Sequence, residues 1–211
     1  MSLVIGVFGM IGCGKTTVAK IIEKKYGYLR IDSDVVGHSL LENDEVKKDL
    51  LSVFGPAIVT KDGLIDRKEL SHRVFADLHL KNKLEAIIWP KMTIKIQELM
   101  NQKRDVVLEA AILFLAGWNQ LCHYTIFIEA PVQKQIKYLK ARHIPNHRLT
   151  NILDSQQDIQ SWKDLATYRI ENSGTRDELE KKVQQVMSSV KERGMEKDEP
   201  QENRKSDRSN R

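Results

Sequence analysis

Residues 9–16 read Gly-Met-Ile-Gly-Cys-Gly-Lys-Thr, which fits the pattern G-x-x-x-x-G-K-[ST]. They directly follow residues 3–8, a continuous apolar run rich in β-branched side chains, which predicts a strand buried on both faces of a parallel sheet. Val18, Ile21 and Ile22 then recur at helical spacing until Gly27. In this strand-to-helix context the pattern predicts a loop that binds phosphate through its backbone N–H groups and the positive end of the helix.

The residues of this loop have separate expected roles. Lys15 should reach the β- and γ-phosphates of a nucleoside triphosphate, the Thr16 hydroxyl should ligate Mg²⁺, and Thr17 should help to hold the phosphates. The predicted nucleotide-binding residues of this segment are Gly9, Ile11, Gly12, Cys13, Gly14, Lys15, Thr16 and Thr17. A loop of this kind occurs in kinases, GTPases and motor ATPases, so other residues must decide the reaction.

Two carboxylates, Asp32 and Asp34, follow the next predicted strand, residues 28–31. Ligands of open α/β sheets bind at the carboxyl ends of the strands, where these side chains would lie. Asp34 is predicted to accept the proton of an attacking hydroxyl and to hold that hydroxyl in line. Asp32 is the weaker candidate, with a role in supporting Mg²⁺ through water, and either aspartate could instead cap the helix that begins near Val35.

The rest of the chain alternates strand-like and helix-like patterns, which predicts an α/β fold, a three-layer P-loop NTPase core with a parallel sheet. Further strands are expected at residues 105–110, 124–129 and 166–170, and helices at 133–142 and 177–190. Helical patterns at 35–41, 46–54 and 67–100 predict a helical substrate-binding insertion. We expect the core to comprise residues 1–43, 104–142 and 164–192, with the insertion at 44–103, a small lid at 143–163 and a disordered tail at 193–211.

Bulk composition limits the function classes. A chain of 211 residues with 41% hydrophobic residues can bury one full-sized core. The net charge of +5 suits a multiply phosphorylated small substrate as well as nucleic acid, and we expect no nucleic-acid partner. Without a long apolar run or a secretory signal, the protein is expected in the cytoplasm with no membrane partner. Cys13 and Cys122 are expected to be reduced thiols, and the histidines lack the spacing typical of zinc sites.

At this point the sequence resembles the dephospho-coenzyme A kinase family over most of residues 3–190. Beyond the loop, the resemblance rests on Ile31-Asp32-Ser33-Asp34 with Gly37-His38, Phe54-Gly55, Gly63-Leu64-Ile65-Asp66-Arg67, Val74-Phe75, Leu84-Glu85, Trp89-Pro90, Leu108-Glu109-Ala110-Ala111, Gln135, Arg142, Gln156 and Asn172-Ser173-Gly174. The resemblance implies transfer of the ATP γ-phosphate to the ribose 3′-hydroxyl of dephospho-coenzyme A, the last step of coenzyme A synthesis.

The resemblance also implies roles for single residues. Arg142 matches the lid arginine, whose guanidinium suits phosphate oxygens, although a surface helix arginine is the alternative. Asn172 and Gly174 would lie beside the adenine of ATP. Arg67 would contact the acceptor or form a salt bridge at a helix start, and Glu109 would serve Mg²⁺ or substrate or form a structural ion pair. The predicted catalytic residues are Asp34, Lys15 and Arg142, and the predicted substrate-binding residues are Asp32, Asp34, Arg67 and Glu109.

Several positions depart from the common family pattern. Trp89 and Ala111 are typical of a subfamily, whereas Leu115 and Tyr138 remove charge near the expected active cleft, and Thr167 replaces a usual aspartate. These changes keep two alternatives open: a kinase for another nucleoside or nucleotide acceptor, and a catalytically impaired nucleotide-binding homologue. A switch GTPase is disfavoured because no Asn-Lys-x-Asp motif is found. We expect a monomer or a weak homo-oligomer.

Overall fold

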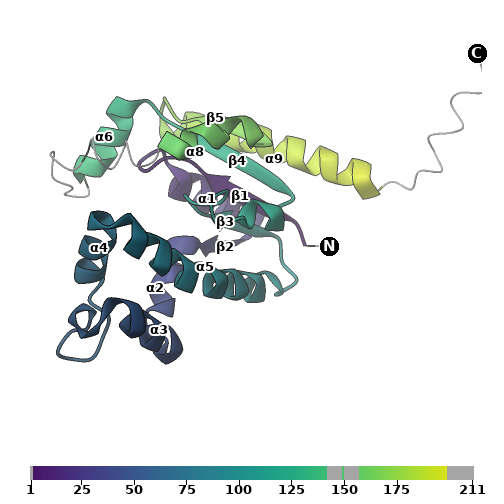
Figure 1. Cartoon of the computed structure of the whole chain (residues 1–211). Helices are drawn as coiled ribbons and strands as arrows, with labels where there is room; N and C mark the ends of the chain where they lie inside the picture. Colours follow the sequence, from purple (N-terminus) through teal and green to yellow (C-terminus); the bar gives the residue numbers. More distant parts are fainter. Residues whose placement is uncertain (1, 142–148, 150–156, 199–211) are drawn as a thin grey trace, which may run out of the picture.

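A parallel sheet in the order β2-β3-β1-β4-β5 forms the centre of the protein in the computed structural model, which describes residues 2–141, 149 and 157–198 (Figure 1). The strands are β1 (Val4–Phe8), β2 (Leu29–Asp32), β3 (Val106–Glu109), β4 (Tyr124–Glu129) and β5 (Tyr168–Glu171). All residues of β1 and β3 are buried, which explains their almost continuous apolar sequences. Because the strands are parallel, their carboxyl ends meet at one edge of the sheet.

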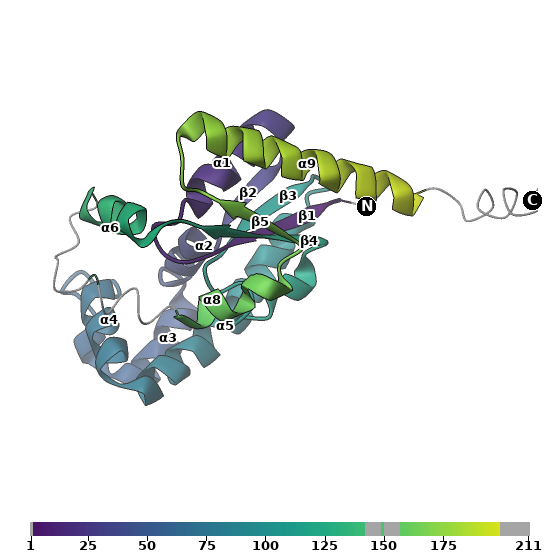
Figure 2. The same ribbon diagram turned by 90° about the horizontal axis from the view of Figure 1, so that it is seen from above.

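Helices cover both faces of the sheet (Figure 2). On one face lie α1 (Lys15–Tyr26) and α9 (Arg176–Asp198), which share an apolar cluster with Ile5 and Val7 of β1. On the other lie α5 (Leu78–Met100), the 3₁₀ helix η2 (Trp118–Leu121) and α8 (Gln157–Ser161), in a second cluster around Phe8. The expected three-layer α/β core with a parallel sheet is therefore confirmed.

The segment between β2 and β3 forms a group of helices at the bottom of Figure 1. Its elements are α2 (Ser33–Leu40), α3 (Asp44–Phe54), the 3₁₀ helix η1 (Pro56–Ile58), α4 (Arg67–Ala76) and α5. Helix α5 packs against α2, α3 and α4. Leu50 and Phe54 belong to the same apolar cluster as Phe8, so this group and the sheet share one core.

The helical pattern over residues 67–100 is broken in the structure at Asp77. The Asp77 carboxylate accepts hydrogen bonds from the backbone N–H groups of His79 (2.8 Å) and Leu80 (3.4 Å), which makes it the N-cap of α5. An aspartate is a favoured N-cap residue, so the sequence does carry this signal.

Three further helices lie before, within and at the end of the predicted lid segment. Helix α6 (Val132–Ala141) follows β4, and Arg142 and most of the predicted lid lie outside the described residues. The described end of that segment is helix α8 and the start of the 3₁₀ helix η3 (Trp162–Leu165). There Ile159 is buried, and the Trp162 ring stacks on Phe114 with 6.0 Å between centroids.

Helix α9 extends farther than the sequence pattern predicts. It continues to Asp198, so residues 193–198 of the segment expected to be disordered are helical. Adding a residue to an existing helix requires no new nucleus, so a packed helix can extend into a polar sequence.

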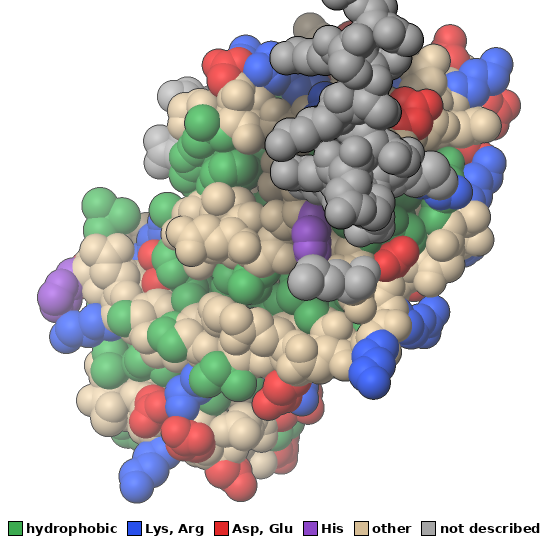
Figure 3. Space-filling view, turned by 90° about the vertical axis from the view of Figure 1, so that its right-hand side faces the viewer, with side chains coloured by type: hydrophobic (Ala, Val, Ile, Leu, Met, Phe, Trp, Pro, Cys, Tyr) green, Lys and Arg blue, Asp and Glu red, His purple; other side chains and the backbone are tan. Residues whose placement is uncertain are grey.

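The surface and three minor features complete the description of the fold. Acidic and basic side chains are interspersed on the face shown in Figure 3. No helix among the described residues is long and apolar enough to cross a membrane. Cys13 and Cys122 are free cysteines, and Trp118 is buried in the core.

Candidate active site

The loop between β1 and α1 has a backbone that requires glycine at three positions. Gly9, Gly12 and Gly14 have φ angles of +146°, +74° and +105°, a region that other residues rarely adopt. A Cβ atom on Gly14 would collide with the side-chain nitrogen of Asn172, and one on Gly9 with the Ile128 carbonyl oxygen. The loop is thus tightly curled against β4 and the loop after β5, as a phosphate-binding loop requires.

Lys15 is the first residue of α1 and folds back over the loop. Its Nζ donates a hydrogen bond of 3.0 Å to the Met10 carbonyl oxygen. Cys13, in the same loop, is fully buried, and burial raises the pKa of its thiol. Of these two side chains, only the lysine is placed to serve an anion in the loop.

A network of charged groups lies beneath Thr16. The Thr16 hydroxyl donates to Oε1 of Glu109, which ends β3 and is 6% exposed. Arg30 of β2 donates from the same Nη1 to Glu109 Oε2 and to Asp32 Oδ2, both at 3.0 Å. One guanidinium therefore pairs with two carboxylates at the carboxyl edge of the sheet.

The two aspartates after β2 have different environments. Asp32 Oδ1 accepts the backbone N–H of Asp34 at 3.1 Å, so Asp32 is the N-cap of α2, the structural alternative expected for one of the pair. Asp34 lies in the first turn of α2 and is exposed. Among the described residues its carboxylate has no hydrogen-bond or ion-pair partner, which leaves it available to a ligand.

Asn172 and Arg67, two further predicted site residues, lie on two other segments. Asn172 directly follows β5, is 3% exposed, and donates from Nδ2 to the Cys13 carbonyl oxygen at 2.8 Å, so it touches the phosphate loop. Arg67 begins α4, is exposed, and forms no salt bridge with any described residue. Its position on the helical insertion is separate from the loop network.

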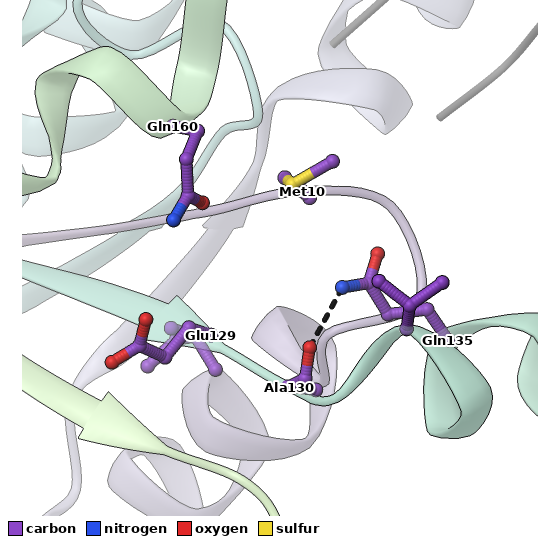
Figure 4. Close-up of a pocket in the computed structure, with 7 residues that line it drawn as sticks. Met10, Glu129, Ala130, Gln135 and Gln160 are labelled. Carbon is purple, nitrogen blue, oxygen red and sulfur yellow. Dashed lines mark hydrogen bonds between the residues drawn. The ribbon is translucent and has the colours of Figure 1, made fainter. Parts of the chain in front are cut away.

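A small cavity of about 170 Å³, lined by both polar and apolar side chains, opens beside the phosphate loop (Figure 4). Met10, Glu129, Ala130 and Gln160 contribute to its wall together with Gln135, whose Nε2 donates to the Ala130 carbonyl oxygen at 2.8 Å. The Oε1 atom of Gln135 is buried and accepts no hydrogen bond from the described residues. This oxygen can accept a hydrogen bond from water or from a bound group.

The structure also places Thr167, Leu115 and Tyr138, which depart from the common family pattern. Thr167 and Thr125 bond each other reciprocally, because each hydroxyl oxygen accepts the other's backbone N–H at 3.1 Å. Both residues lie near the amino ends of β5 and β4, at the edge of the sheet opposite the phosphate loop. Leu115 and Tyr138 are 48% and 46% exposed. Thr167 therefore has a structural role away from the candidate site.

Two residues of this site were missed by the sequence analysis. Arg30 precedes Asp32 by two residues on β2, so their side chains lie on the same face of the sheet, and that spacing was an available signal. Lys134 of α6 donates at 2.7 Å to both Asn172 Oδ1 and the Gly174 carbonyl oxygen. No local sequence pattern connects Lys134 to Asn172 and Gly174, because they lie far from it along the chain.

Comparison with known proteins identifies the family. The family model described as dephospho-CoA kinase matches residues 3–178. The dephospho-CoA kinase of Borreliella burgdorferi is 33% identical over 198 residues, covering 88% of this chain and 95% of that protein.

Solved structures agree with this assignment. TT1252 from Thermus thermophilus has a TM-score of 0.76 at 29% identity, covering 90% of this chain and 98% of that one. Dephospho-CoA kinase from Campylobacter jejuni has a TM-score of 0.66 at 25% identity with the same coverage. The sequence, the curled phosphate loop and these matches together show that the chain belongs to the dephospho-CoA kinase family.

Proposed function

We propose that this chain transfers the γ-phosphate of ATP to the ribose 3′-hydroxyl of dephospho-CoA, giving CoA and ADP. One observation supports this most directly: a phosphate loop and the carboxylate of Asp34, which has no partner among the described residues, occur at the same edge of one sheet. Membership in a kinase family supports ATP as the phosphate donor. The dephospho-CoA kinases among the relatives support dephospho-CoA as the acceptor.

Asp34 acts as the general base in this proposal. The 3′-hydroxyl loses its proton to the Asp34 carboxylate while its oxygen forms a bond to the γ-phosphorus, and the bond from that phosphorus to the β–γ bridging oxygen breaks. Asp32 and Arg30 position Asp34, because the Asp32 carboxylate caps the helix turn that carries it and is itself held by Arg30. A carboxylate without a partner keeps its lone pairs available for this proton transfer.

The phosphates are held by the loop and by Lys15. The Lys15 ammonium exchanges the Met10 carbonyl oxygen for phosphate oxygens, a contact whose charge makes it the stronger of the two. Asn172 and Gly174 lie beside the base of ATP, and Arg67 contacts the acceptor from the helical insertion. Arg142, outside the described residues, supplies a further positive charge to the phosphates.

The residues around Thr16 also fit Mg²⁺. Because the Thr16 hydroxyl donates its hydrogen to Glu109, the lone pairs of its oxygen remain available to a cation. Glu109 and Asp32 would act through water, since Mg²⁺ keeps several water ligands and takes few from protein. Among the described residues, no group of three or more His, Cys, Asp or Glu side chains could hold a metal ion. Phosphate oxygens of ATP and water molecules would be the other ligands of Mg²⁺ at this site. When bound, Mg²⁺ neutralises charge on the phosphates.

The test is acceptor-dependent ADP release from ATP and Mg²⁺, with the product mass measured. Dephospho-CoA should gain one phosphate, whereas CoA, whose 3′-oxygen is already phosphorylated, should give no reaction. AMP and adenosine serve as competing acceptors. Phosphorylation of one of these in place of dephospho-CoA would favour another nucleoside or nucleotide kinase, and ATP binding without any product would favour an impaired homologue.

A further inference from the structure

The loop after β5 is attached to three elements at once. The Asn172 backbone N–H donates to the Glu129 carbonyl oxygen of β4 at 2.7 Å. Thr175 and Glu178 form a reciprocal capping box at the start of α9, because Glu178 Oε2 accepts the Thr175 N–H (2.6 Å) and Thr175 Oγ1 accepts the Glu178 N–H (3.3 Å). The third attachment is Lys134 of α6, which bonds both ends of residues 172–174.

Lys134 determines which way the amide of Asn172 faces. An ammonium can only donate, so the Asn172 atom that it contacts must be the carbonyl oxygen Oδ1. The other amide atom, Nδ2, then faces the Cys13 carbonyl oxygen, to which it donates at 2.8 Å. If the amide were turned over, its NH₂ group would face the Lys134 ammonium and its oxygen would face the Cys13 carbonyl oxygen. Because the amide is buried, neither mismatched pair could be replaced by bonds to water without cost.

This amide in turn orients a peptide unit of the phosphate loop. Across a trans peptide bond the Cys13 carbonyl and the Gly14 N–H point in opposite directions. Holding the carbonyl toward Asn172 therefore directs the Gly14 N–H away from it, and this N–H is one of the loop donors available to phosphate. The absence of a side chain on Gly14 makes the contact possible, because a Cβ there would collide with Asn172 Nδ2.

We propose that Lys134 is a positioning residue for phosphate binding: it acts through Asn172 to hold the Cys13–Gly14 peptide in the orientation that presents its N–H to the nucleotide. The inference rests on the proposed binding of ATP at this loop. Partial desolvation lowers the pKa of Lys134, which is consistent with an ammonium turned inward to the loop. The first turn of α6 also supports the loop directly, since a Cβ on Gly12 would lie only 3.1 Å from the Gln135 carbonyl oxygen.

The experiment measures binding of ATP and of inorganic triphosphate by calorimetry, without any acceptor. Lys134→Met should weaken both by about tenfold, because the loss of one charge-assisted hydrogen-bond chain disorganises the loop that holds the phosphates. Lys134→Arg keeps the donors and should restore most of the affinity. Lys137→Met, three residues along α6 and exposed, is the matched control and should bind both ligands like the wild type.

A second variant tests the orientation of the Cys13–Gly14 peptide without removing Lys134. Asn172→Asp retains an acceptor for Lys134 but places an oxygen opposite the Cys13 carbonyl, so it should weaken triphosphate binding at least as much. Wild-type affinity for both ligands in Lys134→Met, or in Asn172→Asp, would overturn the inference. Loss of ATP affinity with unchanged triphosphate affinity would also overturn it, by placing the effect on the base. A wild-type protein that binds ATP but does not phosphorylate dephospho-CoA would refute the proposed function and leave this inference standing.

Discussion

The phosphate loop and the acceptor side of the candidate site are built in contrasting ways. Around the loop, three side chains of the site are held by hydrogen bonds: Thr16 bonds Glu109, Asn172 bonds Cys13, and Lys15 bonds Met10. On the acceptor side, Asp34 and Arg67 are exposed and have no ion-pair partner among the described residues. The loop is organised before any ligand arrives, whereas the acceptor side keeps its charges free.

This difference has a physical basis. A phosphate loop must hold several backbone N–H groups in one arrangement, and buried side-chain hydrogen bonds limit the alternatives. A general base has the opposite requirement, since a neighbouring cation would stabilise its carboxylate and weaken it as a proton acceptor. Arg30 satisfies both needs by pairing with Asp32 and Glu109 and leaving Asp34 alone.

The largest expected effect follows from the free carboxylate. Asp34→Asn should lower kcat about a thousandfold with dephospho-CoA, because the amide cannot accept the hydroxyl proton. The dissociation constant of ATP, measured by calorimetry, should stay unchanged because the phosphate loop is untouched. Glu42→Gln, an exposed acid just beyond α2, is the control and should retain full turnover. A kcat within tenfold of wild type in Asp34→Asn would remove the base assignment.

The second-largest effect is expected at the phosphate loop. Lys15→Met should lower kcat about a hundredfold and also weaken ATP binding, since in the proposed mechanism the lysine contacts the phosphates before and during transfer. Steady-state kinetics and calorimetry would separate the two losses. Lys20→Met removes an exposed lysine from the same helix and should change neither value. If only kcat fell in Lys15→Met, the lysine would act in the transition state alone.

A smaller effect concerns stability. Arg30→Met leaves Glu109 and Asp32 without their shared cation, which should lower the free energy of unfolding by about 2 kcal/mol. Thermal unfolding should show a Tm lower by roughly 5 °C. Arg104→Met, which loses only a 3.3 Å bond to the Gly27 carbonyl oxygen, is the control and should unfold close to the wild type. Equal Tm values for the two variants would contradict a shared role of Arg30 in the network.

The smallest effect is expected at the exposed capping box that ends the loop after β5. The hydrogen bond from the Thr175 N–H lowers the pKa of Glu178, so its contribution to stability is present above the unfolded pKa and is lost as pH falls through the folded one. Glu178→Gln should therefore lower the urea midpoint at pH 7, and the difference from wild type should shrink below about pH 4. Asp177→Asn, in the same first turn but without this bond, should not show that pH dependence. A constant difference from pH 7 to pH 3 would argue against the charge-dependent cap.

The sequence predicted the phosphate loop correctly but missed the ends of two helices. The phosphate loop and its flanking strand and helix were predicted correctly because glycine, lysine and apolar spacing act over a few residues. The cap formed by Asp32 was recognised as an alternative for the same reason. The break at Asp77 and the extension of α9 were missed, since a continuous helical pattern conceals a cap and a packed helix propagates into polar sequence.

By itself, the sequence determined that this chain has a parallel α/β core with a phosphate loop and a pair of aspartates after the second strand. Only the tertiary structure decided which aspartate lacks a partner among the described residues, because that depends on Arg30 and Glu109, brought together by the pairing of β2 with β3. It also decided that Lys134, Asn172 and Cys13 form one chain of hydrogen bonds across segments far apart in sequence. Spacing along a chain specifies local backbone geometry, whereas the partner of a charged side chain is set by the packing of strands and helices.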